Sequence, residues 1–306
     1  MLYPYRFHPI LAERVWGGDS LARYGKPIPP GKRIGESWEI SDRDDAQSVV
    51  ANGPLAGQTL HQLIQRFGVQ LLGSNCVNAT RFPLLIKLLD ARERLSLQVH
   101  PPAAVAASLG GEPKTEMWYI LEAIPDAHLI AGLKRGVTRQ QFEAAIRQEP
   151  PPLAGLIHRF PVRAGDVLFL PSGRLHALDA GVVIAEIQQN SNTTYRVYDW
   201  GRVGRTLHIE QSLASIDFTD FEPPLTPLPV NCAHFHVEKL ELPDNTTGHC
   251  DGTSFHVLGC MAGSVGIGEE RLNVGEFALL PAALGKYTLK PLTPNSALLR
   301  ATSGRC

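Results

Sequence analysis

Short apolar runs separated by glycine and proline recur along this chain, and they constrain its fold more than any other feature. The sequence holds 28 glycines and 24 prolines, and many of them fall between these runs. Turn-forming residues at such intervals favour short strands over long helices. The pattern therefore predicts a mainly β protein with a few short helices.

Alternating and β-branched apolar residues predict where the strands lie. Two segments instead have helical periodicity: residues 60–67, entered through Thr59, and residues 138–147, where Thr138 and Gln141 are spaced as a capping box. The predicted strands are residues 37–41, 84–89, 95–99, 117–121, 127–130, 167–170, 182–188 and 195–198, followed by 234–242, 254–262, 275–281 and 287–291.

A proline-rich segment at residues 221–229 is the best candidate for a linker. Residues 164–171 also resemble residues 274–281, because each reads as a tight turn, a strand and a proline-marked turn. We therefore expect two related β units, a catalytic unit at residues 1–222 with a short helical insert and a smaller unit at 228–306. Aligning the two places Lys286 opposite His176, so we expect metal ligands only in the first unit.

The overall composition excludes several classes of partner. Hydrophobic residues make up 43% of the chain and charged residues 19%, and the net charge is −1, so we expect a sizeable core and no basic groove for nucleic acid. No apolar run approaches the ~18 residues of a membrane span, and residues 1–9 do not resemble a signal peptide. The sequence thus favours a soluble cytoplasmic protein without membrane partners.

The cysteines also favour a cytoplasmic protein. The five are odd in number and form no Cys-x-x-Cys pair, which predicts scattered free thiols in a reducing compartment. They are Cys76, Cys232, Cys250, Cys260 and Cys306.

Four side chains form a candidate metal site. Gln98 and His100 are two residues apart, so on a strand they point to the same face. Glu116 can add a carboxylate from a neighbouring strand, and His176 follows a tight turn. Two imidazoles, a carboxylate and an amide oxygen form a set that suits zinc and similar divalent metals.

These residues lie in motifs that resemble those of type I phosphomannose isomerases. The motifs are residues 82–101, which end in the Gln98-x-His100 pair, Lys114-Thr-Glu116, residues 165–177 and residues 186–196. Residues 16–18 and 34–41 match near the start, and residues 188–202 resemble the short bacterial branch of the family. The resemblance runs from about residue 7 to residue 218, and less distinctly to the C-terminus.

The resemblance implies a cupin-type double β-barrel (jelly roll) and interconversion of mannose 6-phosphate and fructose 6-phosphate through a cis-enediolate. It implies one zinc ion per chain, held by Gln98, His100, Glu116 and His176. Longer members of the family carry an extra helical domain, and only the helix at 138–147 occupies that region here. The implied partner is a sugar phosphate, and either a monomer or a homodimer is compatible with the sequence.

Further site residues follow from the same motifs. Arg196 matches the catalytic arginine of the family, and it could stabilise enediolate charge or bind phosphate, unless it pairs with Glu186 or Asp199. Lys114 could contact phosphate, or burial near zinc could depress its pKa enough for acid–base chemistry. Glu186 is the other acid–base candidate. Ser96, two residues before Gln98, could bind phosphate or a sugar hydroxyl, or serve only the backbone.

Three residues in the matched segments have expected structural roles. Lys87 lies in an otherwise apolar strand, so we expect it to be paired, near the mouth of a cavity. Trp16 and Trp38 are expected mainly to pack inside the barrel.

Other functions are compatible with a cupin fold. A metal oxygenase would favour iron and a His-x-His pair, where this chain has Gln98-x-His100. A non-catalytic sugar-binding cupin would be expected to lack a ligand, Arg196 or Lys114, and all are present. An isomerase of another sugar phosphate would require the same groups.

Overall fold

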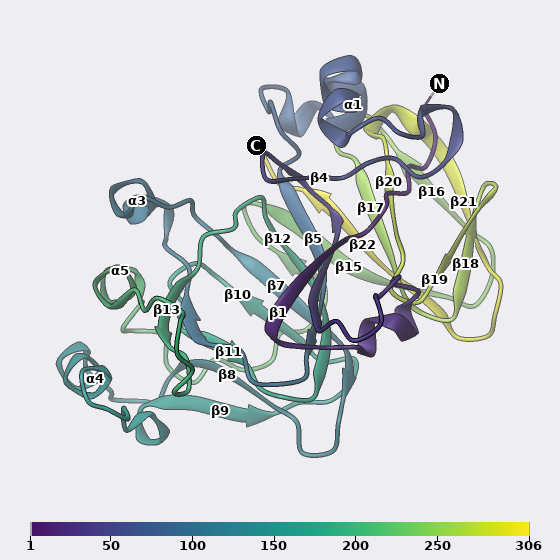
Figure 1. The fold of residues 1–306 in the computed structure, drawn as a ribbon. Helices are drawn as coiled ribbons and strands as arrows, with labels where there is room; N and C mark the ends of the chain where they lie inside the picture. Colours follow the sequence, from purple (N-terminus) through teal and green to yellow (C-terminus); the bar gives the residue numbers. More distant parts are fainter. Residues whose placement is uncertain (1, 306) are drawn as a thin grey trace.

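The computed structural model describes residues 2–305 and is built mainly of antiparallel β-strands, as the sequence predicted (Figure 1). The first unit contains two large sheets. The six-stranded sheet has the order β1 (Ile10–Gly18), β2 (Ile34–Ile40), β5 (Leu84–Ala91), β12 (Val182–Gln189), β7 (Glu116–Ala123) and β10 (Val167–Leu170). The five-stranded sheet has the order β13 (Tyr195–Tyr198), β6 (Leu97–Val99), β11 (His176–Leu178), β8 (His128–Leu133) and β9 (Ile157–Pro161).

The C-terminal part of the chain forms two further sheets, drawn in green and yellow in Figure 1. One contains β14 (Val230–Asn231), β15 (Phe235–Leu242), β22 (Ser296–Ser303), β17 (His256–Ala262) and β20 (Phe277–Leu280). The other contains β16 (Thr246–Cys250), β21 (Gly285–Pro291), β18 (Ser264–Ile267) and β19 (Glu270–Asn273). A short hairpin of β3 (Asp42–Arg43) and β4 (Ala46–Gln47) completes the strands.

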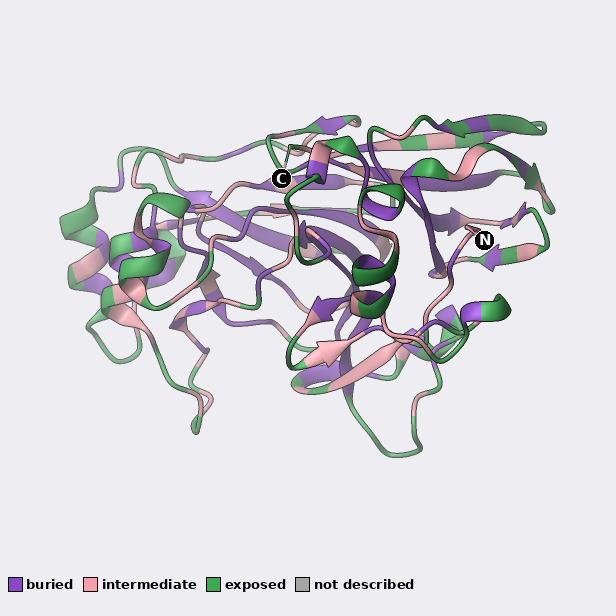
Figure 2. Cartoon of the chain, turned by 90° about the horizontal axis from the view of Figure 1, so that it is seen from above, coloured by how far each residue is buried: buried purple, intermediate pink, exposed green. Residues whose placement is uncertain are grey.

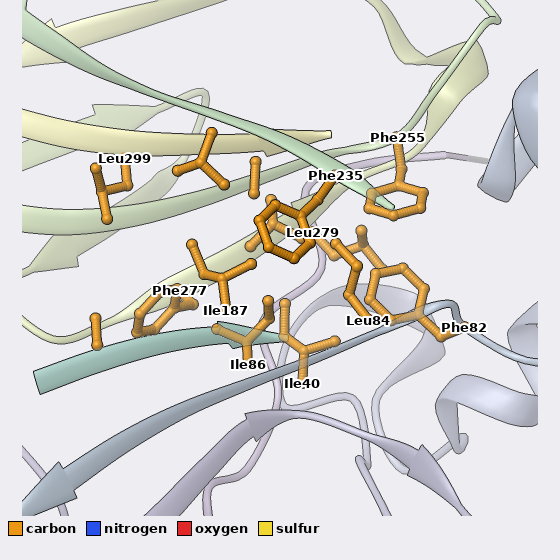
Figure 3. Packing of buried hydrophobic residues seen from close by; sticks show 14 of the residues in the cluster. Ile40, Phe82, Leu84, Ile86, Ile187, Phe235, Phe255, Phe277, Leu279 and Leu299 are labelled. Atoms are coloured by element: carbon orange, nitrogen blue, oxygen red, sulfur yellow. The ribbon is translucent and has the colours of Figure 1, made fainter. Parts of the chain in front are cut away.

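Because side chains alternate along a strand, the apolar residues on the two faces of a sheet belong to different core clusters. On β12, Ile184 packs between the two sheets of the first unit, whereas Val183, Ala185 and Ile187 point to the opposite face. That opposite face packs against the C-terminal sheet of β15, β22, β17 and β20, and Figure 3 shows Ile187 beside residues from both units. A third cluster fills the space between the two C-terminal sheets. The six-stranded sheet is therefore covered on both faces, and the central strands in Figure 2 are buried.

The helices are short and lie mainly at the edges of the sheets. The two predicted helices, α1 (Leu60–Phe67) and α4 (Arg139–Ile146), are confirmed. Both begin with the capping box expected of a threonine followed three residues later by glutamine. The remaining helices, α2 (Val69–Leu72), α3 (Ala103–Ala106) and α5 (Ile209–Ser215), were not predicted. Apolar residues of α4 and α5 cover the outer face of the five-stranded sheet.

The N-terminal segment crosses to the C-terminal unit. Tyr5 and Leu279 exchange two backbone hydrogen bonds of 2.8 Å, and Tyr5 is fully buried. The core on the outer face of the six-stranded sheet also takes residues from both units. The division at residues 222–228 stays a prediction from sequence, and this shared core shows that the two sides pack tightly together.

The prediction of scattered free thiols is wrong for Cys76, which is disulfide-bonded. Cys232, Cys250 and Cys260 are free, as expected, and Cys306 lies outside the described residues. Among residues 2–305, no helix is long and apolar enough to cross a membrane.

Candidate metal centre and active site

Three of the four predicted metal ligands meet in the interior of the first unit. The potential ligand atoms of His100, Glu116 and His176 all lie within 4.8 Å of one another, and all three side chains are buried. The Nε2 atom of His100 lies 3.4 Å from Oε2 of Glu116, and Nε2 of His176 lies 3.5 Å from Oε1. Each carboxylate oxygen thus faces one imidazole nitrogen.

Both imidazoles are oriented by backbone carbonyls. Nδ1 of His100 lies 2.9 Å from the carbonyl oxygen of Thr193, and Nδ1 of His176 lies 2.9 Å from that of Arg174. A carbonyl can only accept, so each Nδ1 carries the proton and each Nε2 offers a lone pair to the cluster. This is the arrangement by which proteins commonly hold metal-binding histidines.

The charge states suit a metal site. Burial and the Lys114 cation lower the pKa of His100 to about 4, and burial lowers the pKa of His176. Both rings are therefore neutral at neutral pH, as a ligand must be. Burial raises the pKa of Glu116, but the Lys114 cation lowers it more, so this carboxylate is ionised.

The oxygens of the Glu116 carboxylate have lone pairs that could bind a cation. Neither of its oxygens accepts a hydrogen bond among the described residues, although both are fully buried. The Nζ atom of Lys114 forms an ion pair with Oε2 at 2.6 Å. A buried carboxylate with free lone pairs beside two neutral imidazoles fits a divalent cation.

Gln98 adjoins this cluster. Its Nε2 atom lies 3.2 Å from Nε2 of His176, and its Oε1 lies 3.4 Å from the hydroxyl of Ser96. An amide nitrogen can only donate, so it donates here to the lone pair on Nε2 of His176, and rotating the amide by half a turn would instead direct Oε1 toward the cluster. Direct ligation by Gln98 remains a prediction.

Strand register explains why these side chains meet. Gln98 on β6 lies opposite His176 on β11 and, on its other side, opposite Arg196 on β13. On the facing sheet, Glu186 of β12 lies opposite Lys87 of β5 and Trp118 of β7. Side chains at paired positions share one face of a sheet, so each sheet contributes a row to the same interior space.

A cavity of about 410 Å³ lies next to the cluster. Gln98 and Lys114 connect the two, because both line the cavity and both contact the histidines. The other lining residues are Arg14, Trp16, Glu36, Lys87, Leu89, Leu95, Ser96, Glu186, Asn192, Thr194, Arg196 and Arg205. Five cationic side chains therefore line the cavity, although the protein as a whole has a net charge of −1.

Lys87 is paired, as predicted. Its Nζ atom lies 3.3 Å from Oε2 of Glu186, 3.9 Å from Oε2 of Glu36 and 4.9 Å from the centre of the Trp38 ring. Burial raises the pKa of Glu36, but Lys87 and Arg14 lower it more, and the result is about 2. Arg14 reaches both oxygens of Glu36, at 2.9 and 3.2 Å.

The tryptophans do more than pack. The indole nitrogen of Trp118 donates to Oε1 of Glu186 at 2.9 Å, and that of Trp38 donates to Oε2 of Glu36 at 2.7 Å. Trp16 lines the cavity. Oε2 of Glu186 accepts no hydrogen bond among the described residues.

Arg196 is not held by a carboxylate. Its Nη1 donates to the carbonyl of Thr206 at 2.8 Å, and its buried Nε has no hydrogen-bond partner among the described residues. The structural alternative, an ion pair with Glu186 or Asp199, is not formed, since Asp199 instead pairs with Arg202 and Arg205. Burial and the neighbouring Arg205 lower the pKa of Arg196.

Opposing effects act on the pKa of Lys114. Burial lowers it, but the carboxylates of Glu116 and Glu186 raise it more. The Nζ atom also lies 3.1 Å from Nε2 of His100. A pKa depressed by burial near zinc stays a prediction.

Sequence reasoning missed the residues that support the site. Thr193 and Arg174 act through backbone carbonyls, which no side-chain pattern reveals. Asn192, Thr194 and Arg205 could have been suspected only from their closeness to Arg196 in the sequence.

Comparison with known proteins identifies the family of this chain. A family model described as phosphomannose isomerase type I, catalytic domain, matches residues 5–120. Mannose-6-phosphate isomerase ManA of Bacillus subtilis is 35% identical over 314 residues, a match that covers 94% of this chain and 96% of ManA.

Solved structures agree as well. A crystal structure of mannose 6-phosphate isomerase from Bacillus subtilis superposes with a TM-score of 0.86 and 31% identity, covering 97% of this chain and 99% of that one. A mannose 6-phosphate isomerase crystallised with zinc and yttrium has the same fold, with a TM-score of 0.79, 17% identity and coverage of 98% and 99%. The predicted cupin-type fold is thus confirmed, and the chain belongs to the type I phosphomannose isomerase family.

Proposed function

We propose that this protein is a zinc-dependent isomerase that interconverts mannose 6-phosphate and fructose 6-phosphate. The observation that carries the proposal is the buried Glu116 carboxylate, which is paired with Lys114, accepts no hydrogen bond from residues 2–305 and faces two neutral imidazoles beside a cation-rich cavity. Relatives named mannose-6-phosphate isomerases, one with zinc in its crystal structure, support the choice of substrate and metal.

His100, Glu116 and His176 would hold the metal, with Gln98 as the fourth ligand. Bound zinc supplies Lewis acidity, which polarises sugar oxygens and favours loss of a proton from the adjacent carbon. Lys114 adds a fixed positive charge next to Glu116. The ligand set carries one negative charge, so a zinc ion held there keeps a net positive charge.

Glu186 is our candidate for the proton transfer between C2 and C1. Trp118 fixes Oε1, and Lys87 lies 3.3 Å from Oε2 without a hydrogen bond, so Oε2 can accept a proton inside the cavity. Removing the C2 proton of the open-chain aldose gives the enediolate. Returning that proton to C1, with a second proton moving from O2 to O1, gives the ketose. Lys114 remains the alternative base.

The phosphate of the substrate would meet Arg196, Lys114 and Ser96. Arg196 is the strongest candidate, because it lines the cavity and, among residues 2–305, its guanidinium has no carboxylate partner and its buried Nε has no hydrogen-bond acceptor. A fork of N–H donors can bind two phosphate oxygens at once. Lys114 is partly neutralised by Glu116, and Ser96 contacts Gln98, so their share is smaller.

The direct test is isomerase activity of the purified protein on mannose 6-phosphate, before and after treatment with a chelator and after adding zinc back. We expect fructose 6-phosphate to form, to stop on chelation and to resume with zinc. Absence of turnover by the zinc-loaded protein would contradict the mannose 6-phosphate assignment. A panel of other sugar phosphates would then separate a different isomerase from a sugar-binding protein.

A second test separates the two candidate bases. In deuterated water, the hydrogen that the wild-type enzyme transfers between C2 and C1 should be partly replaced by deuterium. The extent is set by how fast the protonated base exchanges its proton with solvent. We expect Glu186→Gln to lose both isomerisation and exchange while still binding substrate. Retained exchange in Glu186→Gln, together with its loss in Lys114→Gln, would assign the base to Lys114.

We also expect one zinc ion per chain and a cytoplasmic location. The free thiols of Cys232, Cys250 and Cys260 favour a reducing compartment, whereas the disulfide at Cys76 does not. Metal analysis of the purified protein and cell fractionation test these two points. The choice between monomer and homodimer is left to the measured molecular mass in solution.

A further inference from the structure

The turn between β10 and β11 aims one of the metal-binding histidines. Nδ1 of His176 donates to the carbonyl oxygen of Arg174, only two residues earlier, at 2.9 Å. Because this acceptor belongs to the main chain, no side-chain substitution can remove it. The orientation of the His176 ring therefore depends on whatever holds the turn in place.

The Arg174 side chain provides that hold. Its Nε and Nη2 donate to the two carboxylate oxygens of Asp220, at 2.8 and 2.7 Å, and its Nη1 donates to the carbonyl of Phe169 at 2.6 Å. Both charged side chains are largely shielded from solvent, with 14% and 16% exposure. A bidentate pair in such a setting is strong and highly directional.

Asp220 is itself firmly placed. It follows α5 in the chain, its amide donates to the carbonyl of Asp217 at 3.2 Å, and its carbonyl accepts from the amide of Leu133 at 3.0 Å. The turn makes a second contact with the same segment, because the amide of Asp217 donates to the carbonyl of Gly173 at 2.8 Å. Gly173 has a φ of +95°, which a residue with a side chain rarely adopts.

The other histidine is supported differently. The carbonyl that orients His100 belongs to Thr193, and the Thr193 side chain accepts from the amide of Glu112 at 2.9 Å. That support is a neutral hydrogen bond. The carbonyl that orients His176, in contrast, belongs to a residue held by an ion pair. Neither Arg174 nor Asp220 lines the cavity.

We propose that the Arg174–Asp220 ion pair is a positioning device for the metal centre. It fixes the Arg174 carbonyl, and through that carbonyl it sets both the tautomer and the direction of the His176 ring. Loss of the pair would let the turn relax and would misalign Nε2 of His176 with Glu116. The inference depends on the zinc site proposed above, and it adds two residues that contact neither metal nor substrate.

The test compares zinc affinity in the wild-type protein, Asp220→Asn and a matched control, Glu238→Gln. The control removes a carboxylate from another partly buried arginine pair, Arg300–Glu238 in the C-terminal unit, whose side chains are 26% and 30% exposed. Zinc affinity is measured by competition with a chromogenic chelator, and the absorption spectrum of the cobalt-substituted protein reports coordination geometry. Outer partners of metal-binding histidines typically change affinity by 10–100-fold, so we expect Asp220→Asn to raise the zinc Kd roughly tenfold.

The cobalt spectrum separates positioning from general loss of stability. We expect it to change in Asp220→Asn and to stay unchanged in Glu238→Gln, even if both melt at lower temperature. Should Asp220→Asn not fold, Arg174→Lys serves instead, because it keeps the charge but cannot span both Asp220 oxygens and the Phe169 carbonyl. A folded variant with wild-type Kd and spectrum would overturn the inference, whereas a wild-type protein that binds no zinc would overturn the proposed function itself.

Discussion

Lys87 and Glu186 lie directly opposite each other on neighbouring strands, with Nζ and Oε2 3.3 Å apart in the interior of the first unit. Each side chain is at most 5% exposed. Glu36 approaches Lys87 from the next strand, so one ammonium group serves two buried carboxylates. Burying three ionised side chains is costly, and their ion pairs offset that cost.

Replacing Lys87 with methionine should destabilise the fold strongly. The change leaves Glu36 and Glu186 without their shared cation, and removing one partner of a buried ion pair typically costs roughly 3–5 kcal/mol. Unfolding in urea, followed by circular dichroism, measures the loss. The control is Lys239→Met, which removes a solvent-exposed pair with Glu241 and should cost at most about 1 kcal/mol. Equal losses in the two variants would contradict the interpretation.

Stability should also depend on the ionisation of Glu36. Its folded pKa of about 2 lies below the ordinary value of 4.5, so the unfolded chain binds the proton more readily. The contribution of Glu36 is thus fully present above about pH 4.5 and lost as the pH falls toward 2. The free energy of unfolding of wild type and Glu36→Gln, measured in urea across this range, should converge toward the acid end. A difference that stays constant with pH would argue against a depressed Glu36 pKa.

Zinc should stabilise the folded protein through Glu116. A ligand that binds only the folded state stabilises it by about 2.7 kcal/mol at 100 times its Kd, so the melting temperature should rise with zinc and fall on chelation. Glu116→Gln removes the only carboxylate of the ligand set, and we expect its melting temperature to be insensitive to zinc. His249→Gln, at an exposed position of the C-terminal unit, should respond as wild type does. A zinc response retained by Glu116→Gln would exclude Glu116 as a ligand.

Arg196→Lys should impair turnover although it keeps the charge. An ammonium group cannot replace the planar fork of donors, and loss of one well-placed donor to developing charge typically costs on the order of 100-fold in rate. Steady-state kinetics on mannose 6-phosphate measures the effect. An increase confined to KM would assign Arg196 to phosphate binding, and a decrease in kcat would assign it to the enediolate. Arg147→Lys, in a surface pair with Glu143, should leave both constants unchanged.

Local patterns in the sequence predicted the local structure well. Gln98 lies on β6 and His100 follows directly after that strand, and the threonine–glutamine capping boxes mark where α1 and α4 begin. These features depend on neighbours within a few residues, so the sequence contains them directly. The wider ligand set came from resemblance to a family, and the structure brings three of its members together.

The contacts between distant strands could not be predicted. Nothing near Glu186 in the sequence indicates that it lies opposite Lys87, because register between strands is set by the packing of whole sheets. The carbonyls of Thr193 and Arg174 were missed for a related reason. Every residue has a carbonyl group, so its use depends on where the chain folds and not on which side chain it carries.

The pairing of Tyr5 with Leu279 has a consequence for how the protein is made. During synthesis the fifth residue emerges early, yet its hydrogen-bond partner is added only after more than 270 further residues. The two large sheets of the first unit can begin to assemble before then, while the apolar outer face of the larger one awaits its cover. A nascent chain of this protein therefore exposes an apolar, aggregation-prone surface until Leu279 has been synthesised, and its yield should depend on chaperones during that interval.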